Sequence, residues 1–151
     1  MEIKFLQEFD YKDKSSLFGK MDNLNDAIIK EIRDSENSLN ITLHGLNNIL
    51  SPSGEVVYPY KELEIEYIFE KQNYLDIYVH KGKPCIVTIA ELLNWVEKKK
   101  AEIEMNDWAI TSDGIFLLKL IASPKDIRGK FGVTDIDIRL IPKKIIYRWK
   151  S

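Results

Sequence analysis

The spacing of apolar residues changes along the chain, and each spacing predicts a different kind of element. Residues 2–9 are compatible with a first strand. Between residues 21 and 37, every fourth residue from Leu24 to Ile32 is apolar, which predicts an amphipathic helix with a charged opposite face. Residues 39–46 instead alternate between apolar and polar side chains, which predicts a half-buried strand.

The clearest alternation lies in two stretches, residues 62–70 and 74–80, which flank a short polar segment. We predict that they form a β-hairpin, since both have a period of two and the segment between them is short enough for a turn. Pairing of the two arms would give one apolar face and one face rich in carboxylates and tyrosines. The polar face would consist of Glu62, Glu64, Glu66, Glu70, Tyr74, Asp76, Tyr78 and His80.

A capping box predicts the start of a second helix. In the sequence TIAE at residues 88–91, the Thr88 hydroxyl and the Glu91 carboxylate can each accept a hydrogen bond from the other residue's backbone amide. Apolar residues at helical spacing continue from Ile89 to Ile103. We therefore expect this helix to pack one face against the core.

The rest of the chain predicts further strands. Asp113-Gly114 lies between two apolar stretches and is typical of a hairpin with a type I′ turn. Two more strands are expected at residues 134–141 and 144–149. Together these elements predict an α+β fold, with a mainly antiparallel sheet of about five to seven strands and two principal helices packed on it.

Length and composition indicate one globular domain. The chain has 151 residues, and neither an internal repeat nor a linker-like tract interrupts it, so we expect a single domain over residues 1–151. No stretch approaches the roughly 18 apolar residues that cross a bilayer. The one cysteine cannot form an internal disulfide. These features predict a cytoplasmic protein that does not contact a membrane.

His80 and Cys85 are the first candidates for chemistry, because a thiol near a histidine can act as a nucleophile. A reactive cysteine also needs surroundings that favour the thiolate and a third group that orients the base, and the sequence indicates neither. We therefore expect a buried, inert Cys85 and a surface His80. Structural zinc sites take four Cys or His ligands, whereas the chain has three such residues in total. No catalytic residue, metal site or cofactor is predicted.

A metal-dependent hydrolase, such as a nuclease, is one alternative. Asp135 and Asp137 fall on one side of a predicted strand and could hold Mg²⁺ together with an acid of the hairpin. Arg139 argues against this, because it stands where restriction-type nucleases use lysine and a guanidinium does not act as a base. The simpler interpretation is a solvent-facing strand in which Asp137 and Arg139 pair loosely.

A single-stranded nucleic-acid binder is the other alternative. The last strand combines aromatic and basic residues, a combination that can clamp a single strand. Core aromatics that alternate with solvated Lys and Arg would give the same pattern, and the net charge of −2 argues against general nucleic-acid binding. The residues concerned are Lys143, Lys144, Tyr147, Arg148, Trp149 and Lys150.

We favour a non-enzymatic protein-binding module. In its size, mild acidity and lack of a catalytic set, the chain is similar in type to the small bacterial immunity proteins that bind and block toxins in the cytoplasm. The acidic, tyrosine-bearing hairpin face would then bind another protein with a basic surface, such as a toxin with nuclease activity. The solvated side of an antiparallel sheet alternates in the same way. The sequence leaves the oligomeric state open.

Overall fold

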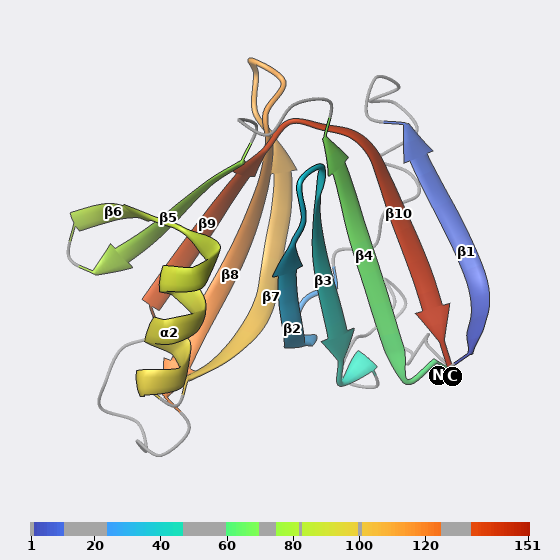
Figure 1. Cartoon of the computed structure of the whole chain (residues 1–151), viewed down its shortest axis with the longest axis horizontal. Coiled ribbons are helices and arrows are strands. Elements are labelled where there is room, and N and C mark those ends of the chain that lie inside the picture. The colour runs from blue at the N-terminus through green and yellow to red at the C-terminus, as the bar shows by residue number, and fades with distance from the viewer. Residues whose placement is uncertain are drawn as a thin grey trace.

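The stretches with alternating apolar and polar residues form strands, and the sheet contains more strands than the sequence predicts. The computed structural model describes residues 2–10, 24–46, 60–69, 75–81, 83–99, 101–124 and 134–151. Within these ranges the chain forms ten strands and one α-helix (Figure 1). The elements are β1 (Ile3–Asp10), β2 (Ile28–Asp34), β3 (Ser38–His44), β4 (Glu62–Phe69), β5 (Leu75–Lys81), β6 (Lys83–Val87), α2 (Ile89–Lys99), β7 (Ala101–Ile110), β8 (Phe116–Pro124), β9 (Thr134–Leu140) and β10 (Pro142–Lys150).

The strands form one antiparallel sheet in the order β1-β10-β4-β3-β2-β7-β8-β9-β5-β6. The strands β2 and β7 share a single residue pair, Ile28 with Glu104, whereas all other neighbours are paired over at least five residues. The sheet therefore consists of two halves joined weakly at its centre. We call them the β4 half (β1, β10, β4, β3 and β2) and the β9 half (β7, β8, β9, β5 and β6).

The sheet also curves back on itself, because β9 and β10 are consecutive in the chain but distant in the strand order. Only Ile141 separates Leu140 of β9 from Pro142 of β10, so these two residues lie at most about 7 Å apart. In a flat sheet, six strand spacings would separate them by about 29 Å. The halves therefore approach each other where the chain arches from β9 into β10 (Figure 1). Tyr67 of β4 and Phe116 of β8 meet there, with ring centroids 5.7 Å apart.

The face enclosed by the two halves is the hydrophobic core. Alternate residues of β4 from Leu63 to Phe69 are buried, as are alternate residues of β9 from Ile136 to Leu140. Because side chains alternate along a strand, the other residues of each strand form a polar outer face. Helix α2 contributes to the same core through Ile89 and Leu92.

The predicted α+β fold, with five to seven strands and two principal helices, is wrong. Residues 28–34 of the first predicted helix form β2, which pairs with β3, and residues 21–23 lie outside the described residues. A spacing of four fits one side of a regular strand as well as one side of a helix, so the pattern does not discriminate between them. In β2 itself, a register shift between Ile29 and Glu31 turns Ile29 and Ile32 toward the core and leaves Ile28 opposite His44. Leu24 and Asp26 have positive φ angles of 57° and 69°, which a continuing helix does not allow.

The predicted hairpin between residues 62–70 and 74–80 is also wrong. Both arms are strands, but β4 is third in the sheet and β5 is ninth. Strand β4 pairs with β10 and β3, whereas β5 pairs with β9 and β6. Alternation therefore identified each strand and its polar side, but not its neighbour.

Several local predictions are confirmed. The strands expected at residues 2–9 and 39–46 are β1 and β3. The capping box forms, since the Glu91 amide donates to Thr88 Oγ1 at 3.1 Å and the Thr88 amide donates to Glu91 Oε1 at 3.4 Å. The helix ends at Lys99, however, so the apolar residue expected at its far end, Ile103, belongs to β7.

The hairpin at Asp113-Gly114 is confirmed, although its turn differs from the expected type I′. Gly114 has a φ of 87°, whereas the φ of Asp113 is not positive. The Gly114 amide donates to the Thr111 carbonyl at 3.0 Å, which describes a type I turn followed by a left-handed glycine. Within the described ranges, no helix is both long and apolar enough to span a membrane.

Candidate functional site

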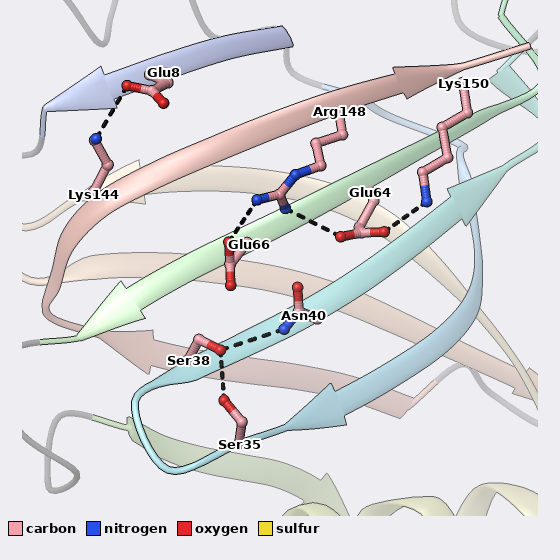
Figure 2. A network of polar contacts seen from close by, with 9 residues as sticks. All are labelled: Glu8, Ser35, Ser38, Asn40, Glu64, Glu66, Lys144, Arg148 and Lys150. Atoms are coloured by element: carbon pink, nitrogen blue, oxygen red, sulfur yellow. Dashed lines mark hydrogen bonds and ion pairs between the residues drawn. The ribbon is translucent and has the colours of Figure 1, made fainter. Parts of the chain in front are cut away.

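The outer face of the β4 half is held together by ion pairs between β4 and β10. One guanidinium, that of Arg148, bridges two carboxylates: Nη1 donates to Glu64 Oε1 at 3.1 Å and Nη2 to Glu66 Oε1 at 2.9 Å (Figure 2). Lys150 Nζ donates to the other oxygen of Glu64 at 2.7 Å. Each of the two glutamates is therefore already bound by a cation of the same chain.

Burial makes this network more than a loose surface contact. The four side chains of the network are only 17–22% exposed. Burial alone would raise the pKa of Glu64, but the hydrogen bond from Lys150 and the charges of Lys150 and Arg148 outweigh it and hold that pKa below its usual value. The carboxylate of Glu64 thus keeps its negative charge, because Lys150 and Arg148 of the same sheet compensate that charge.

The other carboxylates of this face have partners as well. The Lys30 ammonium donates to the buried Glu62 carboxylate, and this bond raises the pKa of Lys30. Lys144 pairs with Glu8 at 3.1 Å (Figure 2). The pair of Arg33 with Glu31 lies at the same distance. Of the predicted partner-binding residues, Glu62, Glu64 and Glu66 therefore lie on a face whose glutamates are satisfied internally.

The other predicted residues that the structure describes lie on the β9 half. Ile77 and Val79 of β5 are 2% exposed and point into the core, so Asp76, Tyr78 and His80 point outward. Strand β9 runs alongside, with Arg139, Asp137 and Asp135 opposite Asp76, Tyr78 and His80 respectively. Glu70 and Tyr74 lie outside the described residues. The predicted surface is thus divided between the two halves of the sheet.

The contacts on β5 and β9 leave carboxylates unneutralised. His80 Nε2 lies 2.9 Å from Asp137 Oδ2, and the Arg139 guanidinium lies over the Tyr78 ring, 5.4 Å from its centroid. The loose pair predicted between Asp137 and Arg139 is therefore replaced by these two contacts. In the described part of the chain, Asp76 and Asp135 form no ion pair with a lysine or arginine.

The excess of acid continues onto β7. Glu104, on the same outer face, has its pKa raised, first by burial and then by the negative charges of Glu102 and Asp26. Lys119 of β8 lies opposite both Asp137 and Asp107. We call this outer surface the acidic face. It carries six carboxylates, Asp76, Glu102, Glu104, Asp107, Asp135 and Asp137, and two cations, Lys119 and Arg139.

A hollow of about 290 Å³ lies within the acidic face. It sits beside a β-bulge of β7, where the register shifts between Met105 and Asp107, and bulges commonly redirect a side chain. The hollow is lined by His80, Asn106, Lys119, Leu120, Asp135 and Asp137.

The acidic face does not bring together the acids that the hydrolase alternative named. In the ranges that the structure describes, no three His, Cys, Asp or Glu side chains come together as a metal site. The hydrolase alternative required an acid of the hairpin beside Asp135 and Asp137, but Asp76 lies opposite Arg139 at the far end of the pairing. The β4 glutamates belong to the other half.

Cys85 is exposed, so the prediction that it is buried is wrong. The reason is its position on β6, which among the described strands is the last of the sheet and has a neighbour on one side only. In the pairing of β5 with β6, Cys85 lies opposite Val79. Its side chain is therefore on the opposite side of the sheet from that of His80, and the two do not form a catalytic pair.

The C-terminal strand has a structural role instead of an open basic and aromatic surface. Tyr147 and Trp149 are 1% and 2% exposed, and Trp149 Nε1 donates to Gln7 Oε1 at 2.8 Å. Arg148 and Lys150 are used in the ion pairs with β4. The residues on which the nucleic-acid alternative depended are therefore largely occupied.

Comparison of the chain with protein-family models, with curated proteins and with solved structures gives no match. Fold and surface thus define a class only, an antiparallel-sheet protein with one acidic outer face. The sequence prediction misses the acids of β7, because it extends a helix to Ile103 and assigns no strand to residues 104–107. The alternation in AEIEMNDW, residues 101–108, was the signal that could have revealed them.

Proposed function

We propose that the protein is a non-enzymatic protein-binding module whose acidic face binds a basic surface of another protein. One observation supports this most directly. Within the described residues, none of the six carboxylates of the acidic face is ion-paired with a lysine or arginine, whereas five glutamates of the β4 half are. Asp137 contacts His80, but charge that the chain's own lysines and arginines leave unpaired attracts and orients a partner of opposite charge.

The acidic face also offers apolar contact area. Tyr78 is half-buried, and Ile86 of β6, which is 68% exposed, lies opposite it on the same side of the sheet. Tyrosine and isoleucine next to charged groups suit an interface, because apolar burial supplies affinity while the charges set orientation. In this proposal the Asp76, Tyr78 and His80 of the predicted site keep their role, and Asp135 and Asp137 join them.

The finer form of the proposal is an immunity-type protein. A bacterial toxin with a basic active-site cleft, such as a nuclease, would be blocked when the acidic face covers that cleft, without any reaction carried out by this chain. A cytoplasmic setting suits the single cysteine, Cys85, because an exposed thiol persists in a reducing compartment.

A charge-reversal experiment tests the binding face. The tagged wild-type protein and an Asp76→Lys/Asp135→Lys variant are used to capture partners from an extract of the source organism, and the affinity of any captured protein is measured by calorimetry at two salt concentrations. We expect at least about a tenfold loss of affinity for the variant, because two attractive charges become repulsive. The affinity of the wild type should fall as salt rises.

The matched control is Asp34→Lys/Glu36→Lys, which makes the same charge change on two exposed acids at the end of β2 and in the turn to β3, where no lysine or arginine of the described residues pairs with them. Binding should survive this change. Equal loss in both variants would mean that net charge matters and the acidic face does not. If the captured partner cleaves nucleic acid, the wild-type protein should inhibit that cleavage and the Asp76→Lys/Asp135→Lys variant should not.

A further inference from the structure

The two halves of the sheet meet between β2 and β7, where few backbone hydrogen bonds hold them together. Ile28 and Glu104 form the one residue pair of these strands in the described part of the chain. Just before β2, the Asp26 amide donates to the Met105 carbonyl at 3.0 Å, and the Met105 amide donates to the Ala27 carbonyl at 2.8 Å. We call this junction, residues 26–28 with 104–105, the seam.

A β-bulge in β2 accounts for the short pairing. The register of β2 with β3 shifts between Ile29 and Glu31, and a bulge of this kind disrupts the ladder on which regular pairing depends. Beside the seam lies a groove of about 330 Å³, which Leu93 and Val96 of α2 help to line. Helix α2 contacts both β2 and β7, so side-chain packing takes the place of backbone hydrogen bonds there.

Three carboxylates oppose the closed seam. Glu102 and Glu104 lie on β7 and Asp26 precedes β2, so both sides of the seam carry negative charge. Burial, together with the charges of Glu102 and Asp26, raises the pKa of Glu104, which means that the folded protein disfavours its ionised form. Within the described residues, none of the three is ion-paired with a lysine or arginine.

The charged groups around the seam do not offset this repulsion. Besides Glu102, the titratable residues that line the groove are Lys30, Glu31 and His44. Lys30 is bound to Glu62 and Glu31 is bound to Arg33. On the other side of β7, Glu104 lies opposite the uncharged Ile121 of β8, and Lys119 of β8 lies opposite Asp107.

The backbone that reaches the seam from the β4 half is strained as well. Leu24 and Asp26 have φ angles of 57° and 69°, a region that costs conformational energy for residues other than glycine. The hydrogen bond from the Asp26 amide to β7 helps to hold this conformation. Separation of the seam would remove that restraint.

We propose that the seam is a conformational joint, at which β2 and β7 separate locally while each half stays folded, and that the negative charges of Asp26, Glu102 and Glu104 favour the open form. Glu102 and Glu104 belong to the acidic face. Positive charge brought to that face therefore favours the closed form, so that charge on the face and opening of the seam are coupled. The proposal goes beyond the protein-binding function and does not depend on it.

Hydrogen exchange followed by NMR tests the joint in the whole protein. Protection factors are used, because they correct for the intrinsic exchange rate of each amide. In the wild type at pH 7, the amides of Asp26 and Met105 should be protected at least about tenfold less than those of Ile65 in β4 and Ile138 in β9, whose strands are paired on both sides. Low urea concentrations should change the exchange of the seam amides little, since local opening exposes little surface.

Charge variants then test what controls the opening. Glu104→Gln should raise the protection factors of the Asp26 and Met105 amides about twofold at pH 7, because one repelling charge is removed. Glu104→Lys, which imitates a cation bound at the acidic face, should raise them further. The matched control is Asp107→Asn, which removes an exposed acid of the same strand beyond the bulge of β7 and should leave both protection factors unchanged.

Two amides at the far ends of the same strands serve as internal controls. The Ser35 amide donates to the Ser38 carbonyl at 2.9 Å, and the Thr111 amide donates to the Ile115 carbonyl at 2.8 Å. Local fraying there does not relieve the repulsion at the seam, so neither amide should respond to the Glu104 variants. Seam amides as well protected as those of Ile65 and Ile138, no response to either Glu104 variant, or an equal response at Ser35 and Thr111 would each overturn the proposal.

Discussion

The outer faces of the β4 half and the β9 half have similar strand sequences but opposite electrostatic outcomes. Glutamates of β4 lie beside β10, whose Arg148 and Lys150 neutralise them. The aspartates of β9 lie beside β5, which brings a tyrosine, a histidine and a further aspartate. An acidic pattern within one strand therefore says little about the charge of a surface, because the neighbouring strand decides whether that charge is cancelled.

The strongest test of the comparison asks whether the two halves share one core. Phe116 of β8 is fully buried and contacts Tyr67 across the halves, and it stacks on Trp108 with centroids 5.6 Å apart. Phe116→Ala should lower the free energy of unfolding by about 3–5 kcal/mol, because it leaves a cavity among aromatic rings. Urea denaturation measures the loss.

Hydrogen exchange then locates the effect of Phe116→Ala. If the halves form one cooperative unit, amides of β4 and β9 should lose protection together. Faster exchange confined to the β9 half would show that the halves unfold separately and that their comparison concerns two independent units. Leu93→Ala on α2, where the side chain is 40% exposed, is the control and should change stability by about 0.5 kcal/mol or less.

A smaller effect distinguishes the two outer faces directly. Arg148→Met leaves Glu64 and Glu66 partly buried without their shared guanidinium, and it should cost about 1–3 kcal/mol. Arg139→Met on the acidic face removes only an exposed guanidinium over Tyr78, and it should cost about 0.5–1 kcal/mol. Both values come from urea denaturation at neutral pH. Equal losses of stability would mean that the ion pairs of Arg148 stabilise the fold no more than the contact of Arg139 with Tyr78 does.

The sequence predicted the local features of this fold well, but it did not predict which strands pair with one another. Alternation located β3, β4 and β5 and gave the polar side of each, and the capping box placed the start of α2. These features depend on residues close in the chain. The pairing of β4 with β10 joins segments about eighty residues apart, and no local pattern records such a choice.

The candidate site was predicted in part for the same reason. Asp76, Tyr78 and His80 do share an outward face, because a strand's own period fixes that. The sequence also suggests Asp135 and Asp137 as possible metal ligands, but their place beside β5 follows from the pairing of β5 with β9, which joins residues 57 positions apart in the chain. The four-residue spacing of Leu24, Ile28 and Ile32 fits both a helix and a strand, so only the packing of β2 against β3 could decide between them.

The smallest predicted effect concerns the pH dependence of stability, to which Glu64 and Glu104 contribute with opposite signs. The pKa of Glu64 is lowered in the folded protein, so its stabilising contribution is present above the unfolded pKa of about 4.3 and is lost as pH falls through the folded pKa. The pKa of Glu104 is raised by burial and by neighbouring acids. Ionised Glu104 therefore destabilises the folded state. This destabilisation develops as the pH rises from the unfolded pKa through the folded pKa, and it disappears again when the pH is lowered.

Neutralising each residue should reproduce these signs. At pH 7, Glu64→Gln should lower the free energy of unfolding by up to about 1 kcal/mol, while Glu104→Gln should raise it by about 0.5 kcal/mol or less. Both differences from the wild type should shrink as the pH falls below about 4, because the wild-type carboxyls then become neutral too. Urea titrations from pH 3 to pH 7 measure this. If Glu104→Gln proves destabilising at pH 7, the carboxylates of the acidic face are compensated within the chain after all, and the contrast between the two halves loses its electrostatic basis.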